Sequence, residues 1–595
     1  MLLLEATLAS AGAAATLHSA ADRGQIALPR VEQFADAPDP FEVFDWTARS
    51  RAFHELLFSP VAAASGMCWI APSDTPIVPH RVDACVSYAN ESLMWTAKYR
   101  TVPGPSNGLA LWGAVLGAAV AGLEHNATRA DGATLPYFDT QSGVFLGGYG
   151  TSPAAGDVGP GHSFWGDLVP NIWVLSISDF YPECAVLRNH TLHAVDRWLA
   201  ASEVMGYNFK HTAFNFTSMR PVNNGHWLEA DASAAVGWIA LMGHEASGNA
   251  SHLDGAVRAI AALEATGFNP FYENLLPYGV LAAARLNAQH AQAFDVAKLL
   301  NWCLDTSTKE RAQWGAVVGR WGNKTVDGLI GSSKDGGGYA FAGNVFWAAS
   351  ALSPIARYDH RFADALGKWL VSISVAGRFF YQDQLGQRQT MPGPWSGDPH
   401  QAIAYEGVRK CDFSRRAGKC LHGTEWGPFG TGQNCGDCGV KAGSGKCGFC
   451  WHLQNGNLTD LGLYGGAFVG LMGGLVQRTD HPHVPQFDLR ANDRFAPDSF
   501  PTVLLYNALN SAQRVHLNTS VAQRYAGRAV DLYETTTDRT LATAMRLDDV
   551  VVTVPAQQAV IVVLLPANSS LQRQGGQVSV NSTVVRYRTP PPPRS

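Results

Sequence analysis

The stretch from Asn223 to Asn287 constrains the fold of this chain more than any other. Its first half opens with Asn-Asn-Gly-His-Trp-Leu-Glu-Ala-Asp and its second with Asn-Pro-Phe-Tyr-Glu-Asn-Leu-Leu-Pro-Tyr-Gly. Ala-rich segments follow each opening, and their apolar residues recur at three- and four-residue spacing, which predicts amphipathic helices. The polar and aromatic residues therefore stand where helices begin. We predict a helical scaffold that presents a polar, aromatic site at one rim.

Helical spacing recurs along most of the chain. A helix is predicted after the polar cap at 106–108, and others over 187–205, 228–244, 253–266, 276–290, 294–304, 341–352, 362–379 and 461–475. Because polar, Gly-rich loops separate these segments, antiparallel helix hairpins are the most economical arrangement. Two regions lack helical spacing. Residues 25–105 predict irregular structure with short helices, and the Gly- and Pro-rich loop 137–164 is long enough to overhang a cleft.

The composition changes after about residue 500. Short, β-branched and partly alternating segments predict strands at 502–506, 514–517, 529–533, 549–554 and 559–565. Five strands in so short a stretch favour a small antiparallel β-sandwich over residues 501–585. The Pro-rich end, residues 586–595, is expected to be disordered. The predicted fold class is therefore mostly α, with a C-terminal β-sandwich.

Length, charge and hydropathy narrow the class of protein. With 595 residues and 46% hydrophobic content, the chain is expected to fold as two unequal domains. A net charge of -5, with 16% charged residues and no long basic run, excludes nucleic acid as a partner. No apolar run long enough for a membrane span follows the N-terminus. The pattern predicts neither a cofactor nor an oligomeric state.

Several features indicate the secretory pathway. Residues 1–24 form an N-terminal tail that resembles the apolar and small-residue parts of a secretory signal, although a basic start is missing. Asn-X-Ser/Thr sequons, which accept N-linked glycans in secreted proteins, occur at Asn90, Asn126, Asn189, Asn215, Asn249, Asn323, Asn457, Asn518, Asn568 and Asn581. Such a density along the whole chain favours a secreted glycoprotein.

Six of the ten cysteines crowd into the Gly-rich stretch 411–452. Two Cys-X-X-Cys pairs there, with two histidines nearby, are compatible with a zinc site, but the spacing between the pairs is shorter than in zinc ribbons. In an oxidising compartment a disulfide-stapled insertion is the favoured interpretation. We therefore predict no metal site.

A run of helical hairpins followed by a β-sandwich resembles the α/α-toroid carbohydrate-active enzymes, that is, the six-hairpin glycosidases and the toroid polysaccharide lyases. The resemblance is architectural and covers residues 106–565. It implies a catalytic toroid over residues 25–500, with the Cys-rich stretch as an insertion, and a polysaccharide or oligosaccharide substrate lying across the open end. Three polar loops, 335–341, 357–361 and 395–407, are expected at the rim of such a toroid.

Glycoside hydrolysis needs two carboxyl groups, one to protonate the leaving oxygen and one to activate water or attack the sugar carbon. The candidates are Glu229, Asp231, Glu273, Asp335, Asp359, Asp398 and Glu406. We predict that Glu273 acts together with Glu229, Asp231 or Asp398. The alternative for Glu229 and Asp231 is helix capping. The predicted substrate-binding residues are His226, Trp227, Tyr272, Asn274, Tyr278, Arg357, His360, Trp395, His400, Tyr405 and Glu406.

Two other functions stay open. A polysaccharide lyase would use Tyr and His to remove and return a proton, and Asn, Arg or His to neutralise a uronate. A glycan-binding or cell-wall protein would use the same scaffold without catalysis. For Arg357, Asp359 and His360, an ion pair and helix cap between helices is the alternative to a site role. Serine hydrolases and zincins are excluded, because no Gly-X-Ser-X-Gly elbow stands between a strand and a helix and no His-Glu-X-X-His occurs.

Overall fold

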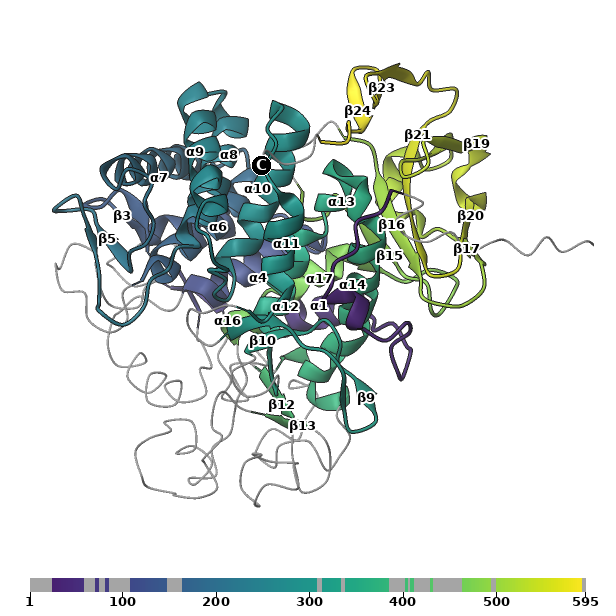
Figure 1. Cartoon of the computed structure of the whole chain (residues 1–595), viewed down its shortest axis with the longest axis horizontal. Helices are drawn as coiled ribbons and strands as arrows, with labels where there is room; N and C mark the ends of the chain where they lie inside the picture. Colours follow the sequence, from purple (N-terminus) through teal and green to yellow (C-terminus); the bar gives the residue numbers. More distant parts are fainter. Residues whose placement is uncertain are drawn as a thin grey trace, which may run out of the picture.

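The computed structural model shows a helical body with antiparallel sheets packed at one side (Figure 1). It describes residues 24–57, 70–73, 81–84, 108–146, 163–307, 313–332, 338–384, 402–404, 407–410, 429–431, 463–493 and 499–590. The fold is mixed, with helices over 46% and strands over 19%. The helical and strand regions follow one another along the chain as predicted.

Six helices form the centre of the helical body, and we call them the central helices. They are α4 (Gly108–Val120), α6 (Phe164–Phe180), α8 (Ala232–Ser247), α10 (Leu275–His290), α12 (Ala342–Leu352) and α17 (Val469–Leu475). Each contacts the next in this order, and α17 contacts α4. Every residue of α4 and α12 is buried, as expected of helices that are apolar on all sides.

Small residues let the central helices approach closely. Gly470 of α17 faces the backbone of α4, and a Cβ atom added to it would lie 2.1 Å from the carbonyl oxygen of Gly117. In α10, a Cβ atom on Gly279 would lie 2.3 Å from that of Ala234 in α8. Real Cβ atoms do not come so near to other heavy atoms, so the Gly- and Ala-rich composition of these helices has a packing cause.

Outer helices alternate with the central ones along the chain. They include α7 (Ala185–Val204), α9 (Ala250–Glu264), α11 (Val296–Leu304) and α14 (Ala363–Ala376). Helix α7 packs on α6 and α8, α9 on α8, and α11 on α10, so the predicted helix hairpins are present. Shorter helices complete this part: α1 (Trp46–Leu57), α5 (Ala127–Thr134), α13 (Ile355–Tyr358) and α16 (Leu463–Gly466).

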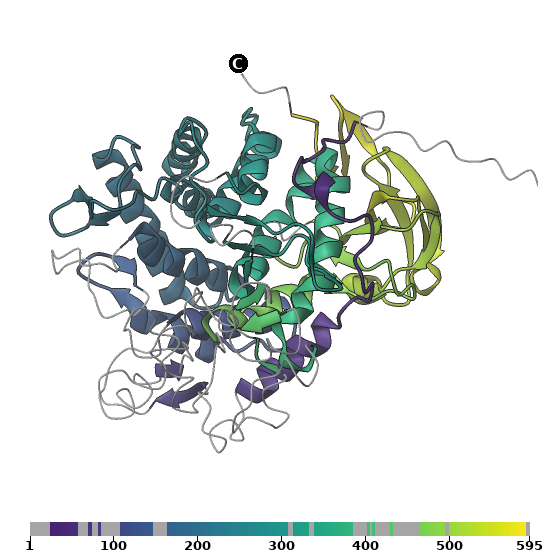
Figure 2. The same cartoon turned by 60° about the horizontal axis from the view of Figure 1, so that its bottom comes forward.

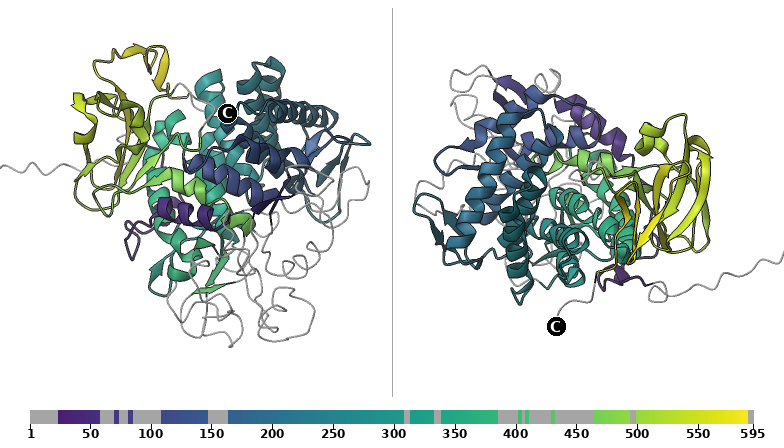
Figure 3. Two further views of the ribbon diagram at one scale, coloured as in Figure 1. Left: turned by 180° about the vertical axis from the view of Figure 1, so that it is seen from behind. Right: turned by 90° about the horizontal axis from the view of Figure 1, so that it is seen from above.

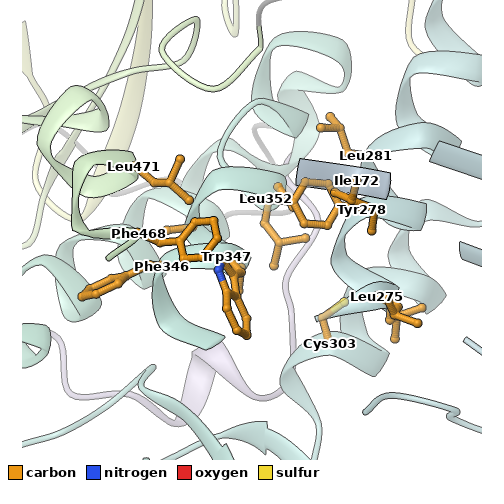
Figure 4. Close-up of a cluster of buried hydrophobic side chains, with 14 of the residues drawn as sticks. Ile172, Leu275, Tyr278, Leu281, Cys303, Phe346, Trp347, Leu352, Phe468 and Leu471 are labelled. Carbon is orange, nitrogen blue, oxygen red and sulfur yellow. The ribbon is translucent and has the colours of Figure 1, made fainter. Parts of the chain in front are cut away.

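A core rich in aromatic rings fills the space between the central helices. Figure 4 shows Ile172 of α6, Tyr278 of α10, Trp347 of α12 and Leu471 of α17 converging in one cluster. The ring centroid of Tyr278 lies 5.4 Å from that of Trp173, in an edge-to-face arrangement. This packing makes the central helices one rigid support for the loops at their ends.

The C-terminal strands form one large antiparallel sheet and two small ones. The six-stranded sheet has the order β14 (Val476–Gln477), β15 (Gln486–Asp488), β16 (Thr502–Asn507), β21 (Gln558–Pro566), β18 (Ala529–Glu534) and β19 (Arg539–Arg546). The small sheets are β17 (Gln513–His516) with β20 (Val551–Val554), and β22 (Gln572–Gln574), β23 (Gln577–Val580) and β24 (Thr583–Arg586). The large sheet begins upstream of residue 501, where the composition changes.

Alternation along β16 explains how the large sheet packs. Leu504 and Tyr506 belong to the core of the helical body, where the sheet lies on α14. Val503 and Leu505 face the other way and pack with side chains of β17 and β20. The further views in Figures 2 and 3 also show the strand region along one flank of the helices. Because successive strand residues point to opposite faces, one strand joins the two cores.

Three parts of the fold differ from the sequence prediction. Helix α6 was not predicted, because it is buried on nearly all sides and contains Pro170, so it shows neither the amphipathic period nor the usual composition of a helix. The predicted segment 461–475 forms two short helices, α16 and α17. At the C-terminus, Arg586 ends β24 and Tyr587 packs on Tyr358, although both were expected in a disordered tail.

Two further findings concern helix hydropathy and the cysteines. None of the helices within the described ranges has the length and hydropathy needed to cross a membrane. Of the ten cysteines, Cys184 and Cys303 lie in described segments, and both are buried, free thiols. The six clustered cysteines of the 411–452 stretch lie outside the described residues.

Candidate functional site

The amino-terminal ends of α6, α8, α10 and α12 lie side by side. Three hydrogen bonds join these ends: Trp165 N to Glu229 Oε2 at 2.7 Å, Tyr272 N to Asp231 Oδ2 at 3.2 Å, and Asn344 Nδ2 to the Glu273 carbonyl oxygen at 3.0 Å. We call this region, comprising residues 163–167, 223–232, 269–275, 314 and 338–344, the amino-terminal rim. It corresponds to the rim predicted from the 223–287 stretch.

Glu229 and Asp231 connect neighbouring helices at the rim. Each is 1% exposed. Asp231 stands at the start of α8 but makes no side-chain capping bond within that helix. Instead, Glu229 accepts from Trp165 at the start of α6, and Asp231 accepts from Tyr272 before α10. Capping therefore occurs, but across helices, and it draws both carboxyl groups to the same rim.

Asp167 adds a carboxyl group that was not predicted. It lies in the first turn of α6, two residues after Trp165, whose backbone N–H is bonded by Glu229. Burial, together with the nearby charge of Glu229, raises the pKa of Asp167 to about 8. The two acidic groups thus differ in setting, since Glu229 accepts a backbone N–H at a helix N-terminus, which favours a negative charge. The raised pKa makes Asp167 the better candidate for the protonated member of the pair.

Glu273 is half-buried and has a strained backbone. Its φ angle of 55° lies in the left-handed region, which is unfavourable for a side chain other than Gly or Asn. Both of its flanks are tied, because Tyr272 donates to Asp231 and the carbonyl group of Glu273 accepts from Asn344. Strain held by its surroundings in this way is typical of functional positions.

Aromatic rings cover the α10 and α12 side of the rim. The ring centroid of Trp314, in β7 (Trp314–Ala316), lies 6.1 Å from that of half-buried Tyr272. It lies 6.3 Å from those of Tyr339 and Phe341 in β11 (Tyr339–Phe341). Trp314, Tyr339 and Phe341 are buried and support this side of the rim, whereas the partly exposed ring of Tyr272 offers an apolar face that suits a sugar ring.

The loop before α8 is organised by Asn224. Its Oδ1 accepts the backbone N–H groups of His226 at 2.9 Å and Trp227 at 3.2 Å. Thr212 Oγ1 in turn donates to the carbonyl oxygen of Trp227 at 2.8 Å. His226 is exposed and Trp227 is half-buried. Both predicted residues therefore stand in an ordered turn at the rim.

Tyr278 lies in the core. It is 3% exposed, and its hydroxyl group donates to Ser350 Oγ at 3.3 Å. Burial raises its pKa well above the usual value. Since it stands one turn inside α10 between Trp173 and Trp238, it packs below the rim as a core tyrosine whose hydroxyl group is hydrogen-bonded.

Arg357 and His360 lie at the other end of the central helices. Arg357 forms an ion pair with Asp493, and Asp493 also lies 3.8 Å from Arg285 of α10. Arg285 is eleven residues beyond Asn274, which corresponds to about 16 Å along a helix. The structure thus places these two predicted residues away from the rim carboxyl groups.

The surroundings of His360 are those of a structural group. Its Nε2 lies 3.1 Å from Nη2 of Arg586, and its carbonyl oxygen accepts from Gln25. Burial and, to a smaller extent, the charge of Arg586 lower its pKa to about 4. Asp359 caps the short turn that follows by accepting from Arg361 N at 3.2 Å. The ion-pair and cap interpretation therefore fits this loop better than a site role.

Some predicted residues lie outside the described part of the chain. They are Asp335, Trp395, Asp398, His400, Tyr405 and Glu406. Conversely, the structure brings Asp167, Trp314 and Asn344 to the rim without their having been predicted. A signal existed for Asp167, because Ser163 followed by an acidic residue in the first turn is typical of a helix start.

Comparison with known proteins does not assign the chain to a family. No protein-family model matches the chain, and a search of the curated proteins finds no match. What the chain does must therefore be inferred from the chemistry of its own residues.

Proposed function

We propose that the chain is a glycoside hydrolase that cleaves a polysaccharide or oligosaccharide at the amino-terminal rim. The observation that carries the proposal is the gathering of four carboxyl groups, Asp167, Glu229, Asp231 and Glu273, on the adjoining ends of three helices. Hydrolysis of a glycosidic bond needs one protonated and one ionised carboxyl group. Such a difference arises when neighbouring acidic groups have different surroundings.

The arrangement of the central helices supports the same function. Their contacts run from α4 through α6, α8, α10 and α12 to α17 and back to α4. We infer that they form the inner ring of an α/α-toroid, with the C-terminal sheets as the accessory β-sandwich domain. The amino-terminal rim is then the open end across which the glycan lies.

We assign roles from the surroundings of each group. Asp167, protonated beside Glu229, donates a proton to the leaving oxygen. Glu273, half-buried and held by Asn344, is the ionised partner that activates water or attacks the sugar carbon. Glu229 and Asp231 hold the helix ends in register, and the charge of Glu229 adds to the burial that keeps the proton on Asp167.

The charge of the rim supports hydrolysis over lyase chemistry. Binding a uronate calls for cationic side chains near the reacting carbon. In the described residues that define the rim there is no Arg or Lys, and His226 is the one basic side chain. The rim is otherwise acidic, aromatic and amide-bearing, which suits a neutral glycan.

Secretion remains part of the proposal. Eight of the sequons fall in described segments, namely those at Asn126, Asn189, Asn215, Asn249, Asn323, Asn518, Asn568 and Asn581. None of these eight asparagines is buried. Each position can therefore carry a glycan on the folded surface.

The test is a digest of a panel of neutral and uronate-containing polysaccharides, measured by new reducing ends and by the ultraviolet absorbance of unsaturated uronates. We expect reducing ends without absorbance on at least one neutral glycan. Glu229→Gln and Glu273→Gln should each lower turnover by roughly a hundredfold or more. Glu203→Gln, whose carboxylate pairs with Arg258 on the exposed surface of α7 and α9, is the matched control and should keep full turnover.

Three results would contradict the hydrolase. Reducing ends accompanied by absorbance would indicate a lyase. The absence of new reducing ends and of absorbance across the panel, together with measurable glycan binding, would indicate a binding protein. Full turnover in both rim variants would move the reaction away from these carboxyl groups.

A further inference from the structure

Four polar atoms around the segment 272–274 have no hydrogen-bond partner among the described residues. They are Oδ1 and Nδ2 of Asn274, Oδ1 of Asn344 and Nε1 of Trp314. These side chains are deeply buried, with exposed fractions of 1%, 0% and 5%. Asn274 starts α10 without capping it. Buried polar atoms are nearly always paired in native proteins, so four in one place call for a partner.

The four atoms belong to one neighbourhood. Asn274 follows Glu273 in the chain, and the other amide group of Asn344, its Nδ2, donates to the Glu273 carbonyl oxygen at 3.0 Å. That bond fixes which atom of Asn344 is the unpaired oxygen. The ring of Trp314 meets the ring of Tyr272 edge to face. Side chains from three separate elements beside the strained segment of the rim thus carry unused hydrogen-bonding capacity.

The chemistry of these atoms indicates the kind of partner. Two are acceptors, the Oδ1 atoms, and two are donors, Nδ2 and Nε1. None carries a charge. Carboxylate and phosphate groups only accept, and an ammonium group only donates, so each would leave half of this set unpaired. A hydroxyl group both donates and accepts and therefore matches it.

We propose that Asn274, Asn344 and Trp314 form a subsite that binds the hydroxyl groups of a neutral sugar. The subsite rests on the proposed hydrolase function and names its substrate class, because an uncharged sugar here would place a ring beside Glu273. Glu229 and Asp231, on the adjoining helix end, add negative charge that disfavours a uronate.

The test uses Asn274→Leu, since Leu has nearly the shape of Asn and no polar atoms. Replacing an unpaired buried amide by an apolar group relieves an unfavourable burial in the free protein. Asn287→Leu is the matched control at the other end of α10. Both amide atoms of Asn287 are bonded to Phe294, at 2.8 Å each, so its loss should lower the melting temperature.

Binding is measured by calorimetry and tryptophan fluorescence with cellobiose, maltose, xylobiose and mannobiose as neutral probes and digalacturonate as the acidic probe. We expect at least one neutral probe to bind and digalacturonate to bind at least tenfold more weakly. Asn274→Leu should raise the melting temperature of the free protein and weaken neutral binding at least tenfold. Asn287→Leu should keep the affinity of the wild-type protein.

Several outcomes overturn the subsite. The first is stronger binding of digalacturonate than of the neutral probes. The second is neutral binding that Asn274→Leu leaves unchanged, and the third is no binding by any neutral probe. The fourth is a lower melting temperature of Asn274→Leu, which would mean that ordered water alone pairs these atoms in the free protein. The proposed function fails separately. If a neutral probe binds in a way that depends on Asn274 but no glycan is turned over, the subsite stands and the hydrolase proposal is wrong. If glycan hydrolysis is observed and Asn274→Leu does not affect it, the hydrolase stands and the subsite proposal is wrong.

Discussion

Asp167 shows how two effects act on one carboxyl group. Burial in the first turn of α6 and, to a smaller extent, the charge of Glu229 raise its pKa to about 8. In the unfolded chain the same group titrates near its ordinary value of about 4. Between these two pH values, the native protein holds a proton that the unfolded chain has released.

This difference predicts a pH dependence of stability. The contribution of Asp167 is fully present below about pH 4 and is lost as pH rises towards about 8. Asp167→Asn, which cannot ionise, should therefore be more stable than the wild-type protein at pH 8 by roughly 2–5 kcal/mol, and equally stable near pH 4. Urea unfolding at a series of pH values measures the gap. A gap that does not widen with pH would contradict the raised pKa.

The backbone conformation of Glu273 is energetically unfavourable. A residue with a Cβ atom at a φ angle of 55° is less stable than Gly in the same conformation. Ala291, which ends α10 with a φ angle of 53°, is strained in the same way at the far end of that helix. The two positions allow strain and function to be separated.

Glu273→Gly and Ala291→Gly should each raise the free energy of unfolding by about 0.5–1 kcal/mol. Only Glu273→Gly should abolish turnover, because only that change removes a reacting group. Chemical unfolding and the glycan digest measure the two effects. Destabilisation by Glu273→Gly would mean that its side-chain contacts outweigh the relief of strain.

At the scale of elements, close approach of backbones governs the central helices. The contact between α4 and α17 depends on Gly470, which leaves no room for a Cβ atom against Gly117. Gly466 of α16 is also buried, but its nearest neighbour would be 3.3 Å from an added Cβ atom. Two glycines of the same segment are therefore under different constraints.

Gly470→Ala should destabilise the protein by about 1–3 kcal/mol, because the added methyl group would push α17 away from α4. Gly466→Ala should change stability by less than about 1 kcal/mol. Thermal unfolding of the two variants side by side is the measurement. Equal effects would show that α4 and α17 do not depend on this contact.

Helix α6 illustrates what periodicity detects and what it misses. Helices with an outward polar face, such as α9, were predicted to within a few residues. Helix α6 has no such face and contains Pro170, so neither its period nor its composition stands out. The loss of α6 from the prediction also removed Asp167 from the candidate site.

At the scale of the whole molecule, buried charges connect the helical body to the strand region. Asp493 lies between β15 and β16 and is 2% exposed. It pairs with Arg357 and accepts from the hydroxyl group of Tyr358 at 2.7 Å. Arg285 of α10 lies 3.8 Å away. One carboxylate thus compensates groups from two segments of the helical body, α13 and α10.

Asp493→Asn should lower the free energy of unfolding by about 3–5 kcal/mol, because it leaves a buried guanidinium group without its partner. Glu203→Gln, which breaks an exposed ion pair with Arg258, should cost less than about 1 kcal/mol. Denaturant unfolding compares the two variants. A loss of stability in Asp493→Asn no larger than that in Glu203→Gln would show that this cluster contributes little to joining the two regions.

Most of the helical spans and the strands β16, β17, β18, β20 and β21 were predictable from periodicity, because one buried face imposes its spacing on the sequence. The rim residues between Trp227 and Asn274 were predictable as well, because polar and aromatic residues directly before an apolar helix lie at the beginning of that helix. Tyr278, Arg357 and His360 are of the same polar and aromatic residue types, but Tyr278 lies in the core, and Arg357 and His360 lie at the opposite end of the central helices. Residue type alone does not distinguish these settings.

The amino-acid sequence by itself determined where helices begin and which of their first turns are polar, since these depend on neighbours in the chain. Only the tertiary structure decided which of those turns meet. The three hydrogen bonds that join the rim connect residues 64, 41 and 71 positions apart. Such contacts depend on how the central helices pack, and that packing is set by the fit of many small side chains at once.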